Sequence, residues 1–113
     1  MELTDAGLKG ITGEFGHVER VMEQVGFARG GAWDYNKASF DLKLEGKDSD
    51  YYLRVQSHVV KGVLEDPKAT IELENPVFLR HIFPHGLDGN TEIPEELENT
   101  IQETIQHIKK ELG

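Results

Sequence analysis

The stretch Tyr51-Tyr52-Leu53-Arg54-Val55-Gln56-Ser57-His58-Val59-Val60 decides the fold of this chain. Its alternate positions form two sets, one mostly apolar and the other mostly polar. The polar-side set is Tyr52, Arg54, Gln56, His58 and Val60. Because successive side chains of a strand point to opposite faces, this period of two predicts a strand with one buried face and one wetter face. Strands with one buried and one solvent-facing side are typical of antiparallel sheets.

The segments around this stretch show the same pattern. Residues 27–35, 38–45 and 68–74 are each predicted to be strands, and residues 8–14 are predicted to be a short one. The connections between the longer strands are polar, and Asn36-Lys37 has the length of a hairpin turn. The sequence therefore predicts neighbouring strands that pair antiparallel.

Two segments have helical periodicity. In residues 15–25, four apolar side chains fall on one helix face, and Gly26 follows where a left-handed residue would end the helix. In residues 94–112, Pro94 stands at the start, and acidic residues precede lysines in the order that the helix dipole favours. Its apolar stripe is Leu97, Ile101, Ile105, Ile108 and Leu112.

The predicted order of elements is β-α-β-β-β-β-α. Residues 77–83 are apolar with two basic side chains, and residues 87–93 are expected to form a polar loop. Two amphipathic helices and a sheet with one wet face bury their apolar surfaces best as two layers. We therefore expect an α+β fold for residues 1–113 as one domain, with both helices on one face of an antiparallel sheet and the long C-terminal helix across it.

The composition excludes several classes of function. The chain has 113 residues with 12 basic and 21 acidic side chains, a net charge of −9. Nucleic-acid backbones and anionic membrane surfaces attract basic proteins, so neither is an expected partner. There is no cysteine, which excludes disulfides, thiol nucleophiles and thiolate metal sites. We expect no secretion signal and no membrane span, and hence a cytoplasmic location.

The polar side chains Tyr52, Arg54, Gln56 and His58 form a row that allows three interpretations. Tyrosine and arginine are enriched at interface hot spots, so the row is a candidate dimer or partner surface. It could also line a polar space beneath the long helix. In the third interpretation it is a solvated face on which Arg54 pairs across strands with Asp41, Glu45, Glu72 or Glu74.

Two further candidates lie in the predicted turns. Trp33 and Tyr35 could form a pocket wall with Asp34 as an acid or acceptor, or Trp33 could fill the core while Asp34 caps the next turn. His81 and His85 have a spacing seen in metal sites, but Pro84 lies between them and disfavours the required helix. We therefore predict neither a metal nor a cofactor.

Three segments together resemble the YugN-like family of Gram-positive, spore-forming bacteria. They are Gly31-Ala32-Trp33-Asp34-Tyr35, Tyr51-Tyr52-Leu53-Arg54-Val55-Gln56 and Phe83-Pro84-His85-Gly86, and the similarity extends over almost the whole chain. The resemblance implies a small cytoplasmic α+β domain of the kind found in helix-grip and TATA-binding-like folds. It brings no established activity.

Together these observations favour a non-catalytic binding or interaction module, acting as a homodimer or on another cytosolic protein. The alternative is an enzyme that binds a small molecule between the sheet and the C-terminal helix. In that case His85 or His58 would be the general base, Arg54 would hold an anionic substrate, and Asp34 would orient it.

Overall fold

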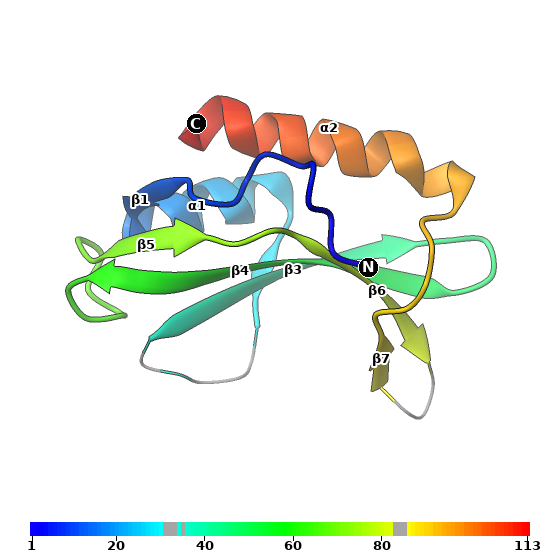
Figure 1. Ribbon diagram of the computed structural model, residues 1–113, viewed down its shortest axis with the longest axis horizontal. Coiled ribbons are helices and arrows are strands. Elements are labelled where there is room, and N and C mark those ends of the chain that lie inside the picture. Colours follow the sequence, from blue (N-terminus) through cyan, green and yellow to red (C-terminus); the bar gives the residue numbers. More distant parts are fainter. Residues whose placement is uncertain (31–33, 35, 83–85) are drawn as a thin grey trace.

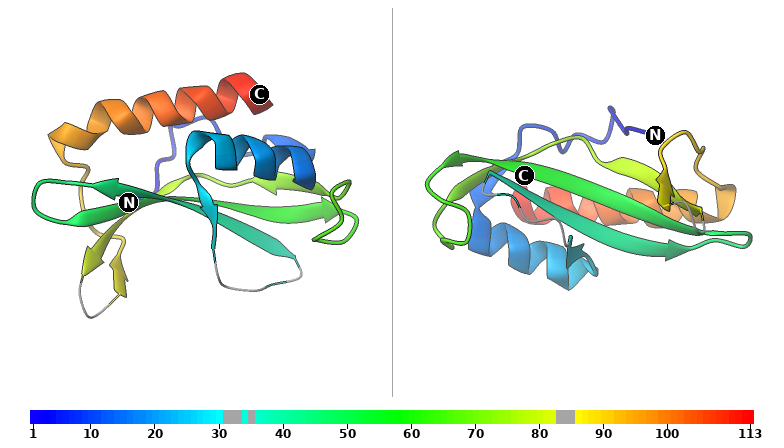
Figure 2. Two further views of the ribbon diagram at one scale, coloured as in Figure 1. Left: turned by 180° about the vertical axis from the view of Figure 1, so that it is seen from behind. Right: turned by 90° about the horizontal axis from the view of Figure 1, so that it is seen from below.

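The chain folds into an antiparallel sheet with two helices on one side of it (Figure 1). The computed structural model describes residues 1–30, 34, 36–82 and 86–113. The helices are α1 (Phe15–Val25) and α2 (Glu95–Leu112). The strands are β1 (Thr12–Glu14), β2 (Ala28–Arg29), β3 (Lys37–Glu45), β4 (Asp50–Lys61), β5 (Thr70–Leu73), β6 (Val77–Ile82) and β7 (Gly86–Asp88). The predicted α+β class, with both helices on one face, is confirmed (Figure 2).

Strand β4 organises the sheet. One of its edges pairs with β3, from Lys37 opposite His58 to Glu45 opposite Asp50. The other edge pairs with two strands in succession, β5 beside Ser57–Lys61 and β6 beside Tyr51–Arg54. The strand order is therefore β1-β5-β4-β3-β2, with β6 and β7 continuing from the first half of β4.

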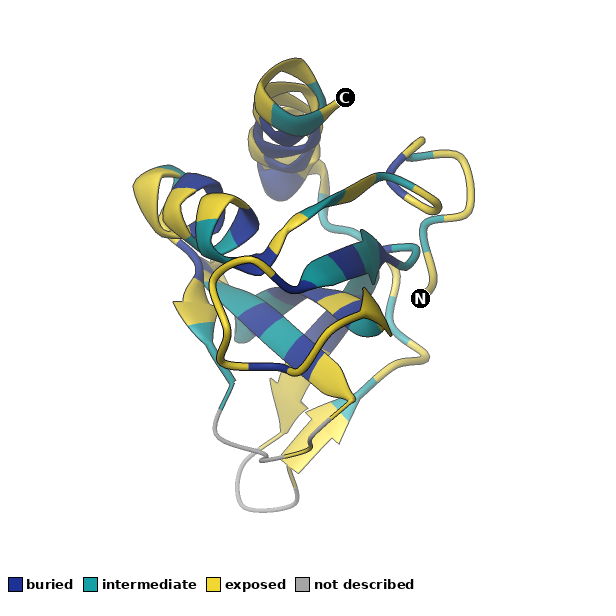
Figure 3. Cartoon of the chain, turned by 90° about the vertical axis from the view of Figure 1, so that its left-hand side faces the viewer, coloured by how far each residue is buried: buried dark blue, intermediate teal, exposed yellow. Residues whose placement is uncertain are grey.

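The core fills the space between the sheet and the helices, where buried residues gather in Figure 3. Leu53 and Val55 of β4 are fully buried in one cluster with Ile101 and Ile108 of α2. Along β4 from Asp50 to Ser57, burial alternates with a period of two, as the sequence predicts. The residues between the buried ones must therefore face away from the helices.

Both helices end and begin close to the predicted positions. Gly26 follows α1 with φ 110°, and its N–H donates to the carbonyl of Glu23 at 3.0 Å. Helix α2 begins at Glu95, and the extended Pro94 precedes it as the cap instead of being its first residue. Within the described ranges, neither helix has the length and apolarity needed to cross a membrane.

The edges of the sheet depart from the sequence prediction. Residues 77–82 form β6 and residues 86–88 form β7, and neither was predicted as a strand. In β6 both Phe78 and Leu79 are buried, so the run lacks the alternation that marks a half-wet strand. The strand predicted for residues 27–35 is reduced to Ala28–Arg29 among the residues described there.

Candidate functional site

The face of the sheet opposite the helices carries most of the predicted site residues. We call it the helix-free face. It is made by the side chains that alternate with the core positions: Lys37, Ser39, Asp41 and Lys43 of β3, Tyr52, Arg54, Gln56 and His58 of β4, and Glu72 of β5. The predicted row on β4 therefore lies in the middle of this face, with Gln56 exposed and the other three side chains half-buried.

Arg54 pairs with Asp41, which lies directly opposite on β3. Its Nε donates to Oδ1 at 2.8 Å and its second guanidinium nitrogen, Nη2, donates to Oδ2 at 3.0 Å. These hydrogen bonds raise the pKa of Arg54 further above its ordinary value, against the opposing effect of burial. Asp41 is thus the cross-strand partner among the four acids considered for Arg54.

His58 lies between two carboxylates, one on the neighbouring strand β5 and one just after its end. Its Nε2 is 3.2 Å from Oε2 of Glu72, and its Nδ1 is 2.6 Å from Oε1 of Glu74. One ligand atom from each of these three side chains lies within 4.8 Å of the others, so the group has the donors that a metal ion needs. However, the two ring nitrogens face different carboxylates, so the contacts already tie the imidazole to β5.

Tyr52 lies at the other end of this face. Its ring meets that of His81 on β6 edge to face, with the ring centroids 6.4 Å apart. The neighbouring Tyr51 points to the opposite side, where its ring stacks on Phe78 at 5.1 Å. The two adjacent tyrosines therefore serve different faces, one the core and one the candidate surface.

A hollow of about 450 Å³ lies on the helix-free face. Lys37 and Ser39 of β3 and Gln56 of β4 are among its lining residues. The full lining is Glu2, Asp34, Lys37, Ala38, Ser39, Gln56, Ser57, His58, Glu74, Asn75 and Val77. The buried Oγ of Ser39 has no hydrogen-bond partner within the described part of the chain. Most of the residues around the hollow thus carry polar side chains, whereas the Oγ of Ser39 lies beneath its surface.

The predicted candidates do not all reach this hollow. Asp34, Gln56 and His58 line it, whereas Tyr52 and Arg54 lie outside its lining. Asp34 is exposed, and its Oδ1 accepts the backbone N–H of Asn36 at 2.8 Å, which is the turn-capping role considered for it. The candidates Trp33, Tyr35 and His85 lie outside the described residues.

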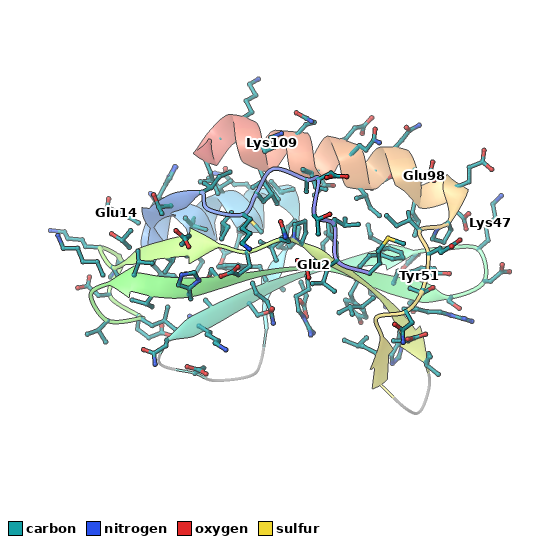
Figure 4. All side chains as sticks on the ribbon, in the orientation of Figure 1. Glu2, Glu14, Lys47, Tyr51, Glu98 and Lys109 are labelled. Atoms are coloured by element: carbon teal, nitrogen blue, oxygen red, sulfur yellow. The ribbon has the colours of Figure 1, made fainter. Side chains whose placement is uncertain are left out.

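Several of the lining residues were not identified from the sequence, among them Glu2, Lys37, Ser39 and Asn75. Glu2 lies where the N-terminal segment meets β6, and its Oε2 accepts the side-chain amide of Asn75 at 2.8 Å (Figure 4). No local pattern signals a contact between residues so far apart in sequence. Lys37 and Ser39 do carry a signal, because the alternation of β3 assigns them to the same face as Asp41.

A pocket between the sheet and the C-terminal helix cannot contain Arg54 or His58. Both belong to the face that points away from α2, so this part of the alternative hypothesis is wrong. A second hollow of about 500 Å³ does lie beside α2, between it and the N-terminal segment. Its lining includes Leu3, Ile101 and Ile105 but none of the predicted site residues.

Comparison with known proteins identifies similar chains. The model of the YugN-like family matches residues 4–111. The uncharacterized protein YlbA of Bacillus subtilis is 32% identical over 110 residues, which cover 96% of this chain and 92% of YlbA. The uncharacterized protein YugN of the same organism is 31% identical over 75 residues, or 66% of this chain and 56% of YugN. The crystal structure of YugN from Geobacillus kaustophilus superposes with a TM-score of 0.85 at 33% identity, covering 99% of this chain and 94% of that one.

Proposed function

Because the chain belongs to the YugN-like family, whose matched members carry no stated activity, we propose its function from the geometry of the helix-free face. The protein is a non-catalytic binding module that acts as a homodimer through this face. The observation that carries the proposal is the distribution of charge. Lys37 lies at one side of the face, and Glu72 on β5 and the adjoining Glu74 lie at the other. The charges between them are paired within the chain, Asp41 with Arg54 and Lys43 with Asp50 at 3.6 Å.

Two contacts support a binding role over a catalytic one. A general base needs a nitrogen presented to its substrate, but both ring nitrogens of His58 already contact carboxylates. An anion-binding arginine needs its donors, but Arg54 directs two of them at Asp41. The proposal keeps the cytoplasmic location that the family resemblance implies.

The proposal is tested by the mass of the protein in solution. We expect sedimentation velocity to show a concentration-dependent dimer for the unmodified chain. Gln56→Arg, in the middle of the helix-free face, should give a folded monomer because it introduces bulk and like charge at the contact. Gln106→Arg is the matched control, because Gln106 is also exposed but lies on α2. A monomer at all concentrations of the unmodified chain, or an unchanged dimer of Gln56→Arg, would overturn the proposal.

The hollow on the same face supports a second candidate function, the binding of a small polar molecule. Its volume of about 450 Å³ falls within the range of roughly 300–1,000 Å³ typical of ligand pockets. Native mass spectrometry of protein purified without chelators tests this candidate. Extra mass that is retained by the folded chain and lost in Lys37→Ala would support it. The unmodified mass alone would count against it.

A further inference from the structure

The strand register arranges the helix-free face in rows that cross the sheet. In one row Lys37 of β3 lies opposite His58 of β4, which in turn lies opposite Glu72 of β5. In the next row Ser39 lies opposite Gln56, whose backbone carbonyl accepts the backbone N–H of Glu74 at 2.8 Å. Each of these rows has a hydrogen-bond donor at its β3 end and a carboxylate at its β5 end.

When two copies of this face stack, the direction of the twofold axis decides whether like or opposite charges meet. A homodimer with closed symmetry presents the same patch on both subunits. If two such faces stack about an axis perpendicular to the strands, β3 lies over β3, and Lys37 approaches the partner subunit's Lys43. If the axis runs parallel to β4, β3 of one subunit lies over β5 of the other. The donor at the β3 end of each row then meets the carboxylate at the β5 end of the same row in the partner subunit.

We propose that the dimer axis runs along β4, so that Lys37 forms an ion pair with the partner subunit's Glu72, twice in each dimer. This inference rests on the proposed homodimer and adds its geometry. Face-to-face sheets pack about 10 Å apart, a distance that long side chains such as lysine and glutamate can bridge.

The axis also assigns roles to the residues of β4. Tyr52, Gln56 and His58 lie near the axis and face their own counterparts, and tyrosine is well suited to the centre of an interface. Arg54 lies near the axis as well, but its ion pair with Asp41 offsets the repulsion between the two guanidinium groups. The Oγ of Ser39 is closed to solvent in the single chain, and a rotation about χ1 would turn this hydroxyl towards the partner subunit's Glu74. The two hollows face each other and enclose one polar chamber.

Charge exchange between two variants tests the axis directly. Lys37→Glu places glutamate against glutamate at both contacts, and Glu72→Lys places lysine against lysine. We expect each variant alone to raise the dimer Kd at least about tenfold, which corresponds to about 1.4 kcal/mol. A mixture of the two should restore a tight heterodimer, because both contacts then join a glutamate to a lysine. Native mass spectrometry with one variant labelled with nitrogen-15 detects that heterodimer.

The controls separate failure of the axis from failure of the dimer. Lys110→Glu and Glu103→Lys make the same changes at exposed positions of α2 and should leave the dimer unchanged. If the unmodified chain is a monomer, the proposed function itself is wrong. If it is a dimer that neither single variant weakens, or if mixing does not favour the heterodimer, the axis is wrong and the dimer stands.

A single introduced thiol gives a second measurement that does not depend on charge. Because the chain has no cysteine, Gln56→Cys carries the only thiol, and near the axis two such thiols lie face to face. A short bismaleimide should therefore link two copies of Gln56→Cys. Ala28→Cys, on β2 at the far side of β3 from β4, is the control and should link poorly. Equal linking of both variants would overturn the inferred axis.

Discussion

Arg54 on β4 binds Asp41 on β3 through two hydrogen bonds, at 2.8 and 3.0 Å. The two residues are direct register partners, so the ion pair joins two adjacent strands on the helix-free face. Because the charges of Arg54 and Asp41 cancel, the pair adds no net charge to the helix-free face between Lys37 on β3 and the glutamates on the β5 side. Arg54, the cation of the predicted site, thus forms an ion pair within the sheet.

The Arg54–Asp41 pair should stabilise the fold measurably. We expect a double-mutant cycle of Arg54→Gln and Asp41→Asn to give a coupling free energy of about 1 kcal/mol, because the pair is bidentate and partly buried. Urea unfolding of the two single variants and the double variant measures it. A coupling indistinguishable from zero would show that the contact does not persist in solution.

The ion pair between Arg29 and Glu65 should make stability depend on pH in the acid range. The two side chains lie 2.6 Å apart, and the hydrogen bond from Arg29 lowers the pKa of Glu65 below its ordinary value of 4.5. The stability from this shift is therefore complete above about that value and is lost as the pH falls through the folded-state pKa.

Glu65→Gln isolates this contribution. Its urea midpoint should lie below that of the unmodified chain at neutral pH, and the two midpoints should converge on acidification. Glu103→Gln, at an exposed position of α2, is the matched control and should leave the midpoint at neutral pH unchanged. A gap between Glu65→Gln and the unmodified chain that stays constant with pH would contradict the assignment.

Gly26 should resist substitution because it ends α1 in a left-handed conformation. With φ at 110°, an alanine there is strained, and its Cβ would lie 3.2 Å from Cδ1 of Leu42. We expect Gly26→Ala to lower the free energy of unfolding by about 1–2 kcal/mol. Gly89→Ala is the control, because its Cβ would make only an ordinary contact with Leu79 at 3.7 Å. Equal losses in the two variants would argue against the cap as the cause.

The parts of the fold that were predictable have a periodic local pattern. The alternation in β3 and β4 and the stripes of α1 and α2 arise because each element buries one face and exposes the other. Strand β6 escaped prediction because Phe78 and Leu79 are both buried, which leaves no period of two. Its place between β4 and β7 depends on tertiary pairing that local sequence does not encode.

The site was predictable to the extent that it depends on one strand. The row from Tyr52 to His58 shares a face because of β-strand geometry alone. The choice of Asp41 for Arg54 required the register between β3 and β4. The contact between Glu2 and Asn75 joins residues 73 positions apart, so only the folded chain reveals it.

Two serines on neighbouring strands should respond in opposite ways to the loss of their hydroxyl groups. Ser57 is 1% exposed, and its Oγ donates to the carbonyl of Ala38 at 2.9 Å. Ser57→Ala should therefore cost about 1 kcal/mol. The Oγ of Ser39 is buried without a partner in the described ranges, so Ser39→Ala should leave the free energy of unfolding unchanged or slightly raised.

Ser39 and Ser57 also allow the stability of the fold to be separated from the affinity of the dimer. In the proposed dimer, Ser39 donates to the partner subunit's Glu74, so Ser39→Ala should raise the dimer Kd although the isolated fold is no weaker. Urea unfolding at low concentration and sedimentation velocity measure the two effects separately. The Ser57 hydroxyl is buried and already bonded to the Ala38 carbonyl, so Ser57→Ala should destabilise the fold without changing the Kd. If Ser39→Ala instead destabilises the fold as much as Ser57→Ala and leaves the Kd unchanged, its hydroxyl has a partner within its own chain and contributes nothing to the interface.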